Sequence, residues 1–201
     1  MPTTDRTRLL ALARRRGVIT AQDAGRAGIH SQQITRLVAG GVIERIARGQ
    51  YRLAERPVTE RHALVVASRA VPRGVICLLS ALGFHGIGTQ LPAEVWIAIE
   101  RRAREPTVRQ LPLKVVRFSG AAFTEAIETH RIEGETVRVY SVAKTLADLF
   151  KHRNKVGMDV ALEALREAWR ERKFTMEALD RAARVCRVER VMRPYVEAVV
   201  S

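Results

Sequence analysis

Apolar positions with helical spacing occur in three short stretches near the start of the chain. The first stretch predicts a helix from Asp5 to Arg16, with leucines and alanines on its buried side and Gly17 as its stop. In the second stretch, Thr20 fits an N-cap and Asp23 follows three residues later, which makes a shortened capping box. The chain is therefore predicted to open with two helices, the second of them brief.

A third helix is predicted after Gly28, with Ser31 as its N-cap and a pair of glycines as its stop. Ile34, Leu37 and Val38 have the three-four spacing of one buried face. At about 100° per residue, the polar residues between them lie on or beside the opposite face. These outward positions are Ser31, Gln32, Gln33, Thr35 and Arg36.

The segments VIERI and QYRL come next and predict two strands. They flank Ala47, Arg48 and Gly49, where the glycine supplies the positive φ that a tight hairpin needs. This ribbon also carries Arg45 and Arg52. Three helices followed by a hairpin are the layout of a winged helix-turn-helix, so we predict that fold for the start of the chain.

A domain boundary is predicted within residues 54–59, AERPVT, because this joint is polar and contains a proline. It separates a winged helix-turn-helix domain over 1–56 from an α+β domain over 57–201. We expect the second domain to combine a small sheet with a C-terminal helical bundle. The predicted fold class of the whole chain is α+β, mostly helical.

Within the second domain, EVWIAI and LKVVRF predict strands, and AIETHRIEGETVRVYS predicts a hairpin. The segment ICLLSALGFHGI is apolar nearly all round, which predicts a deeply buried helix. Ser141 fits the N-cap of the helix that follows the hairpin, and Pro194 predicts either a kink in the last helix or its first turn. The remaining helices are expected over 60–71, 142–152, 158–171, 175–184 and 188–200.

The chain is strongly basic and its charge is unevenly spread. Its 201 residues carry 35 Lys+Arg, all but five of them arginine, against 21 Asp+Glu, for a net charge of +14. Residues 1–56 hold half of this excess in little more than a quarter of the length. A codon bias toward arginine explains the number of arginines but not their clustering, whereas a polyanionic partner explains both.

No constellation of residues in the sequence indicates catalysis. The five histidines are scattered, GFHGIG lacks the lysine of a phosphate loop, and no motif of a nuclease or nucleotidyltransferase core is present. Asp148 lies among apolar residues, which favours a structural hydrogen-bond acceptor over a catalytic acid. Cys77 and Cys186 are distant in sequence and predict buried thiols rather than a disulfide or zinc site. We therefore expect no enzyme activity, no metal and no cofactor.

The N-terminal segment has charges on both sides of a short apolar run, unlike a signal peptide. No apolar run approaches the roughly 20 residues of a membrane span. These features predict a cytoplasmic protein without a membrane partner.

The polar face of the third helix and the basic ribbon together predict a surface for double-stranded DNA. Glutamine suits adenine and arginine suits guanine in the major groove, while arginines on a wing suit phosphates or the minor groove. The candidate DNA contacts are Ser31, Gln32, Gln33, Thr35 and Arg36 on the helix, and Arg45, Arg48 and Arg52 on the wing.

Several of these features have alternative explanations. Gln32 and Gln33 also fit a solvated helix face, and Tyr51 fits packing beneath the hairpin better than base stacking. The arginines at 14–16 fit a solvated last turn that complements the helix dipole, or contact with the DNA backbone. A winged helix that binds only proteins fits the order of elements but not the basic charge.

The stretch GVITAQDAGRAGIHSQQITRLVAGGVIERIARGQYRL resembles the N-terminal winged helix of AbiEi-type antitoxins, from type IV toxin–antitoxin systems in phage-defence operons. The segments LLSALGFHGI, VWIAI and VYSVAKTLADLFKHR are similar to the second domain of that family. The resemblance implies that the winged helix binds inverted repeats in its own promoter and represses it. It also implies that the second domain counters a nucleotidyltransferase-like toxin without forming a stable complex.

The resulting hypothesis is a non-enzymatic, sequence-specific DNA-binding autorepressor and antitoxin. An inverted repeat implies two copies per operator, as a dimer or by cooperative assembly on DNA. Two other classes stay open. A regulator whose second domain senses a small ligand predicts a pocket in that domain, and an enzyme acting on DNA predicts convergent acidic residues and metal dependence.

Overall fold

The computed structural model describes residues 5–54, 60–90, 92–106, 108 and 111–200. The chain forms two compact units, one of Met1–Val65 with Arg131–Thr136 and one of Val66–His130 with Val137–Ser201. The predicted boundary after residue 56 falls on residues 55–59, which lie outside the described ones. Each unit has its own hydrophobic core.

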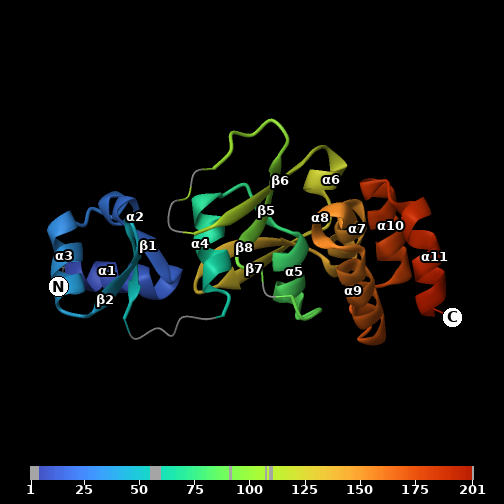
Figure 1. Cartoon of the computed structure of the whole chain (residues 1–201). Helices are drawn as coiled ribbons and strands as arrows, with labels where there is room; N and C mark the ends of the chain where they lie inside the picture. Colours follow the sequence, from blue (N-terminus) through green and yellow to red (C-terminus); the bar gives the residue numbers. More distant parts are fainter. Residues whose placement is uncertain (1–4, 55–59, 91, 107, 109–110, 201) are drawn as a thin grey trace. The chain divides into compact units, whose positions relative to one another are not determined.

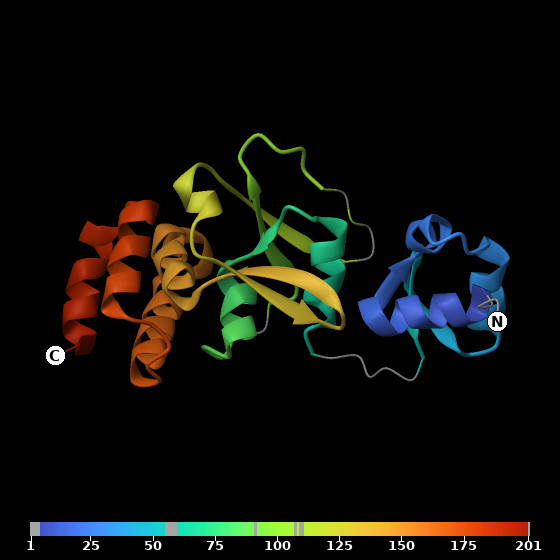
Figure 2. The same cartoon turned by 180° about the vertical axis from the view of Figure 1, so that it is seen from behind.

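The first unit contains a winged helix, and the α+β class is confirmed (Figures 1 and 2). Its three strands form an antiparallel sheet in the order β1-β3-β2. Strand β1 was not predicted, because three residues are too few to show a period. The elements between residues 5 and 54 are α1 (Asp5–Arg16), β1 (Val18–Thr20), α2 (Ala21–Arg26), α3 (Ser31–Ala39), β2 (Ile43–Ala47) and β3 (Gln50–Leu53).

The winged-helix core joins α1, α3 and the sheet. Leu9 of α1 and Ile34 of α3 are buried in it, and Val38 packs partly buried at its edge. Tyr51 of β3 also packs partly buried against this core, which confirms its predicted packing role. The polar face of α3 is left outside as a result.

The caps of α2 and α3 differ in how well the sequence indicates them. The capping box of α2 is confirmed, because Asp23 N donates to Thr20 Oγ1 at 3.0 Å and Thr20 N donates to Asp23 Oδ2 at 2.8 Å. The predicted cap of α3 is wrong by one residue. The N-cap is His30, whose Nδ1 accepts from Gln32 N at 3.4 Å, and Ser31 is the first helical residue.

The second domain contains a five-stranded sheet in the order β6-β5-β4-β8-β7. The short strand β4 lies at its centre, antiparallel to β5 and parallel to β8, and β5 runs parallel to β6. The hairpin turn between β7 and β8 uses Glu133 and Gly134, both at positive φ, as a tight two-residue turn requires. The strands are β4 (Val75–Ile76), β5 (Val95–Glu100), β6 (Leu113–Phe118), β7 (Ile127–Ile132) and β8 (Glu135–Tyr140).

Helix α5 (Leu78–His85) bonds to the strands on both sides of β4. Trp96 N of β5 donates to Ser80 Oγ at 2.9 Å, and His85 Nε2 donates to the carbonyl oxygen of Tyr140, the last residue of β8, at 2.8 Å. The segment ICLLSALGFHGI was predicted to be helical throughout. Its first residue, Ile76, instead belongs to β4, and this part of the prediction is wrong.

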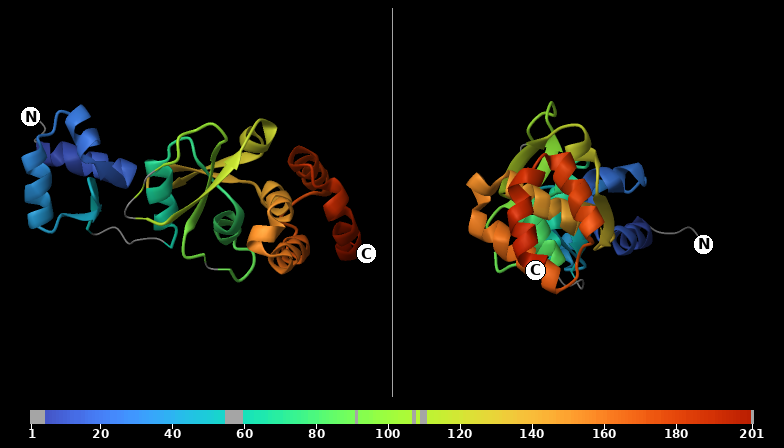
Figure 3. Two further views of the ribbon diagram at one scale, coloured as in Figure 1. Left: turned by 45° about the horizontal axis from the view of Figure 1, so that its top comes forward. Right: turned by 90° about the vertical axis from the view of Figure 1, so that its right-hand side faces the viewer.

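The C-terminal helices gather at one end of this sheet, as the orange and red ribbons in Figure 3 show. Helix α7 is buried along Val142–Phe150 and shares one core with α5, α9, α10 and α11. Pro194 lies inside α11 rather than in its first turn. The helices outside the winged helix are α4 (His62–Ala70), α5, α6 (Ala121–Thr124), α7 (Val142–Lys151), α8 (Arg153–Val156), α9 (Met158–Arg170), α10 (Met176–Cys186) and α11 (Glu189–Val200).

In the described part of the chain, no helix is both long enough and apolar enough to cross a bilayer.

Candidate nucleic-acid interface

The outward face of α3 carries the side chains that the sequence singled out. Ser31, Gln32, Thr35 and Arg36 are exposed, whereas Gln33 is half-buried. Thr35 Oγ1 lies 3.5 Å from the Ser31 carbonyl oxygen, so it faces the helix backbone as much as solvent. In the described part of the chain, the side chains of Gln32 and Arg36 have no polar partner. Their donors and acceptors are therefore available to a ligand.

The wing tip presents a second basic group. Arg48 is exposed at the turn between β2 and β3, next to Gly49 at φ +75°. Arg45 is exposed too, and its Nε donates to the Ala47 carbonyl oxygen at 3.3 Å across a β-bulge. This bond holds the Arg45 side chain along the wing and leaves its terminal nitrogens for another partner.

Arg52 does not belong to this exposed set, and the expectation that it faces outward is wrong. Its residue is 8% exposed, and its guanidinium forms an ion pair with Glu44 on the neighbouring strand. The sheet register pairs Glu44 with Arg52 and Arg45 with Tyr51. Because side chains alternate along a strand, Arg45 and Arg52 lie on opposite faces of the wing.

The basic end of α1 divides in a similar way. Arg14 and Arg15 are exposed, whereas Arg16 Nη1 donates to Asp23 Oδ1 at 2.6 Å. Asp23 also caps α2 through Thr20, so one carboxylate ties the end of α1 to the start of α2. Arg16 therefore positions α2 and is not part of a solvated basic run.

The electrostatics of this surface are one-sided. Between residues 27 and 54 the sequence holds a single carboxylate, Glu44, and Arg52 pairs with it. Arg36, Arg45 and Arg48 thus keep their positive charge without an acidic neighbour in this stretch. A surface of this kind attracts an anion such as the phosphate backbone of DNA.

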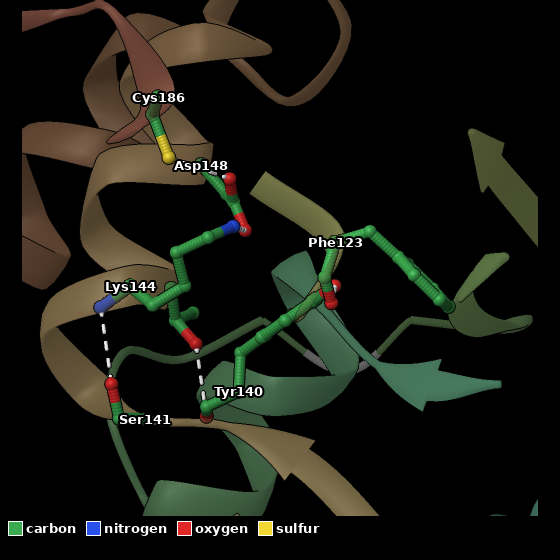
Figure 4. Close-up of polar contacts among 7 residues, drawn as sticks. Phe123, Tyr140, Ser141, Lys144, Asp148 and Cys186 are labelled. Atoms are coloured by element: carbon green, nitrogen blue, oxygen red, sulfur yellow. Dashed lines mark hydrogen bonds and ion pairs between the residues drawn. The ribbon is translucent and has the colours of Figure 1, made fainter. Parts of the chain in front are cut away.

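A buried polar cluster in the second domain is a different kind of site (Figure 4). Lys144 Nζ lies 2.6 Å from Asp148 Oδ2, and Cys186 Sγ donates to Asp148 Oδ1 at 3.2 Å. The Lys144 ammonium also lies 4.2 Å from the ring centre of Tyr140 and 4.7 Å from that of Phe118. All of these side chains are buried, so the pair is enclosed in the core.

The cluster has the chemistry of a structural element. Burial raises the pKa of the Asp148 carboxyl, and the Lys144 ammonium opposes this rise. Burial also raises the pKa of the Cys186 thiol to about 12 and that of Cys77 well above its usual range, so both thiols stay protonated and unreactive at neutral pH. Asp148 acts here as a hydrogen-bond acceptor. The sequence reading missed Lys144, although opposite charges four residues apart on an apolar helix signal such a pair.

The cap of α7 completes the cluster. Ser141 Oγ accepts from Lys144 N at 3.3 Å, as predicted for an N-cap, and Tyr140 Oη donates to the Phe123 carbonyl oxygen at 2.8 Å. Among the described residues, no group of three or more His, Cys, Asp or Glu side chains is placed to hold a metal ion.

A known protein family matches the first part of the chain but not the second. Residues 8–54 match the model of a family described as "Transcriptional regulator, AbiEi antitoxin". The AbiEi resemblance is thus confirmed over the winged helix, and the match does not extend to the second domain. None of the curated proteins compared with the chain matches it.

A solved structure extends the likeness to most of the chain. The crystal structure of the RV2827C protein from Mycobacterium tuberculosis superposes with a TM-score of 0.56 at 16% sequence identity. The alignment covers 89% of this chain and 70% of that one. At this identity the likeness concerns the fold alone.

Proposed function

We propose that the chain is a DNA-binding autorepressor and the antitoxin of its own operon, with no enzymatic activity. The observation that carries the DNA-binding part is the outward surface of α3 and the wing tip. There, Gln32, Arg36 and Arg48 are exposed without a protein partner among the described residues. The family match over residues 8–54 supports a regulator and antitoxin in the same chain.

In this proposal α3 lies in the major groove. Gln32 and Arg36 contact base edges, because a glutamine amide pairs with adenine and a guanidinium with guanine. Ser31 and Thr35 lie beside them and donate to bases or to phosphates. Arg45 and Arg48 on the wing contact the flanking phosphates, which positions the helix without reading sequence.

The operator is expected to be an inverted repeat that binds two copies of the chain. Equivalent half-sites then lie about one helical turn, roughly 34 Å, or a multiple of it apart. The toxin partner is expected to be a nucleotidyltransferase-like protein encoded beside this chain. No stable complex with it is expected.

The proposal is tested with the full chain and a labelled duplex from its own promoter, compared with a scrambled duplex of the same composition. Fluorescence anisotropy at several salt concentrations should show tighter, salt-sensitive binding to the promoter. Equal affinity for both duplexes would remove sequence-specific repression, and no binding at any salt would remove DNA binding altogether. Arg166 is an exposed arginine on α9, so the variant Arg166→Ala is the matched control for arginine variants of the DNA surface such as Arg36→Ala.

The antitoxin role needs a separate experiment. Expression of the full chain should restore growth of cells that express the neighbouring toxin. The variant Arg36→Ala should lose promoter repression but keep this rescue, since Arg36 belongs to the DNA surface. Loss of rescue by a folded Arg36→Ala protein would show that the two roles are not separate.

A further inference from the structure

A cavity of about 450 Å³ lies in the second domain. Its walls come from the end of β6, the start of α6 and the C-terminal turns of α7 and α10. Inward it reaches Asp148 and Cys186, which are 1% and 5% exposed. A cavity of this size is typical of sites for small organic ligands.

Basic side chains surround this cavity. Lys151 of α7 and Arg187, the C-cap of α10, are exposed and line it, and neither has an ion pair or side-chain hydrogen bond in the described part of the chain. The carboxylate on the wall is that of Asp148, whose charge Lys144 compensates at 2.6 Å. The cavity is therefore a region of net positive charge.

Arg117 of β6 also lines the cavity; its charge is paired with Glu105, and its position is fixed. Its Nη1 donates to the carbonyl oxygens of Arg101 and Ala103 at 3.0 and 2.7 Å, and its Nη2 lies 3.3 Å from Glu105 Oε2. Three of the five N–H groups are thus engaged within the protein. A guanidinium held in this way loses little side-chain freedom when a ligand arrives.

The remaining wall offers neutral groups. His152 lies against Phe118 with 5.5 Å between ring centres, and its pKa is lowered to about 4 by burial and by nearby lysines, of which Lys155 has the largest effect. At neutral pH its ring is therefore uncharged and supplies one donor and one acceptor. Ser119 adds an exposed hydroxyl, and Ala122 belongs to a small apolar surface beside it.

We propose that this cavity binds a small organic phosphate of about the size of a mononucleotide. Lys151 and Arg187 neutralise the phosphate group, and Arg117 donates its remaining N–H groups to the phosphate oxygens. The uncharged ring and the small apolar surface take the rest of the molecule.

The binding is tested by NMR on the isotope-labelled full chain, titrated separately with AMP, ribose 5-phosphate and inorganic phosphate. Because the chain carries a net charge of +14, anions also collect at the winged helix. The residues whose amide signals shift therefore show which of the two sites binds the ligand. Saturable shifts are expected at the amides of residues 119–122, 151–152 and 186–187. AMP or ribose 5-phosphate should bind about tenfold tighter than inorganic phosphate, since they also contact the apolar surface.

Variants separate this site from general attraction of anions. Lys151→Gln should weaken AMP binding about tenfold or more, because it removes a charged hydrogen bond. Lys114→Gln is the control, since it removes the same charge from an exposed position on β6 outside the cavity wall, and it should change the affinity less than about twofold. Arg187→Gly should act like Lys151→Gln and keeps the left-handed backbone at φ +57°.

Ala122→Trp tests the cavity without changing a charge. It should abolish AMP binding by filling the space. Equal weakening by Lys151→Gln and Lys114→Gln would overturn the proposal, as would shifts confined to α3 and the wing. It would also fail if duplex DNA, and none of the three phosphates, shifts the cavity amides. If Ala122→Trp does not fold, the comparison of Lys151→Gln with Lys114→Gln, two variants at exposed positions, still tests the proposal.

Discussion

At the scale of single residues, the wing shows how one position along a strand separates binding from structure. Arg45 and Arg52 belong to neighbouring registered pairs and therefore lie on opposite faces. Arg45 remains exposed, whereas Arg52 is buried and paired with Glu44. The sequence alone places Arg45 and Arg52 in the same hairpin, so both were predicted to contact DNA. The register that separates them depends on the bulge between Arg45 and Ala47, which the sequence pattern does not show.

Arg36→Ala should weaken binding to the operator more than binding to random DNA, by about 1–3 kcal/mol, because a base contact is lost. Binding of the full chain to promoter and scrambled duplexes measures this difference. Equal losses on the two duplexes would mean that Arg36 contacts only phosphate.

Arg48→Ala should change DNA binding but not stability, and Arg52→Ala should change stability but not DNA binding. Arg48→Ala should weaken binding to all duplexes and flatten the salt dependence by about one unit of log-log slope, with stability unchanged. Arg52→Ala should keep the slope but lower the free energy of unfolding by about 1 kcal/mol, because Glu44 loses its partner. Salt titrations and urea unfolding of both variants check this. A flatter slope for Arg52→Ala would return that residue to the DNA surface.

At the scale of elements, long periodic helices were predicted well and very short elements were not. The bounds of α1, α9 and α11 lie within a residue of the predicted ones. Strands β1 and β4 have three and two residues and exist because their neighbours provide hydrogen-bonding partners. The cap of α3 moved to His30 because a histidine ring nitrogen accepts the bond that a serine was expected to accept. The two short strands depend on tertiary contacts, so local sequence cannot specify them, whereas the His30 cap is a local bond between residues two apart.

Helix α7 carries a buried ion pair inside an otherwise apolar element. Lys144→Ala should lower the free energy of unfolding by about 3–5 kcal/mol, because it leaves the buried Asp148 without its cation. The double variant Lys144→Met, Asp148→Leu should recover most of this loss, since it removes both charges and keeps apolar volume. Urea unfolding of the two variants and the unchanged chain measures both effects. A double variant as unstable as Lys144→Ala would assign the stability to packing around the lysine stem instead.

At the scale of the whole molecule, the sequence predicted the winged helix in more detail than the second domain. The basic winged helix was predicted from spacing and composition, and the family match covers the same residues, 8–54. For the second domain, the pattern of predicted strands and helices gave the α+β class but neither the strand order nor the basic cavity. Lys151 and Arg187 line that cavity together although they are distant in sequence. Only the packing of α7 beside α10 brings them to one place.

Mild acid should destabilise the chain through its buried histidines. Burial lowers the pKa of His85, and it lowers that of His152 to about 4. In the unfolded chain a histidine has a pKa of about 6.5, so the unfolded state binds more protons between about pH 6.5 and 4. The stability that these neutral histidines provide is complete above that window and is lost as the pH falls through it.

The urea midpoint should therefore fall between pH 7 and about pH 5, and His152→Gln should show a smaller fall. A midpoint that does not change over this range in the unchanged chain would contradict the assignment. An equal fall in His152→Gln would exclude His152 as the source.

The two-residue strand β4 makes the centre of the sheet its narrowest join. On one side only Ile76 is in register with Val139 of β8, yet Ser80 and His85 of α5 reach the strands on both sides. Helix α5 thus links the two halves of the sheet that meet at β4. The two halves of the sheet are therefore held together by a helix more than by strand pairing. The backbone amides of β4 and of its partner strands should exchange with solvent at the rate at which α5 detaches from the sheet.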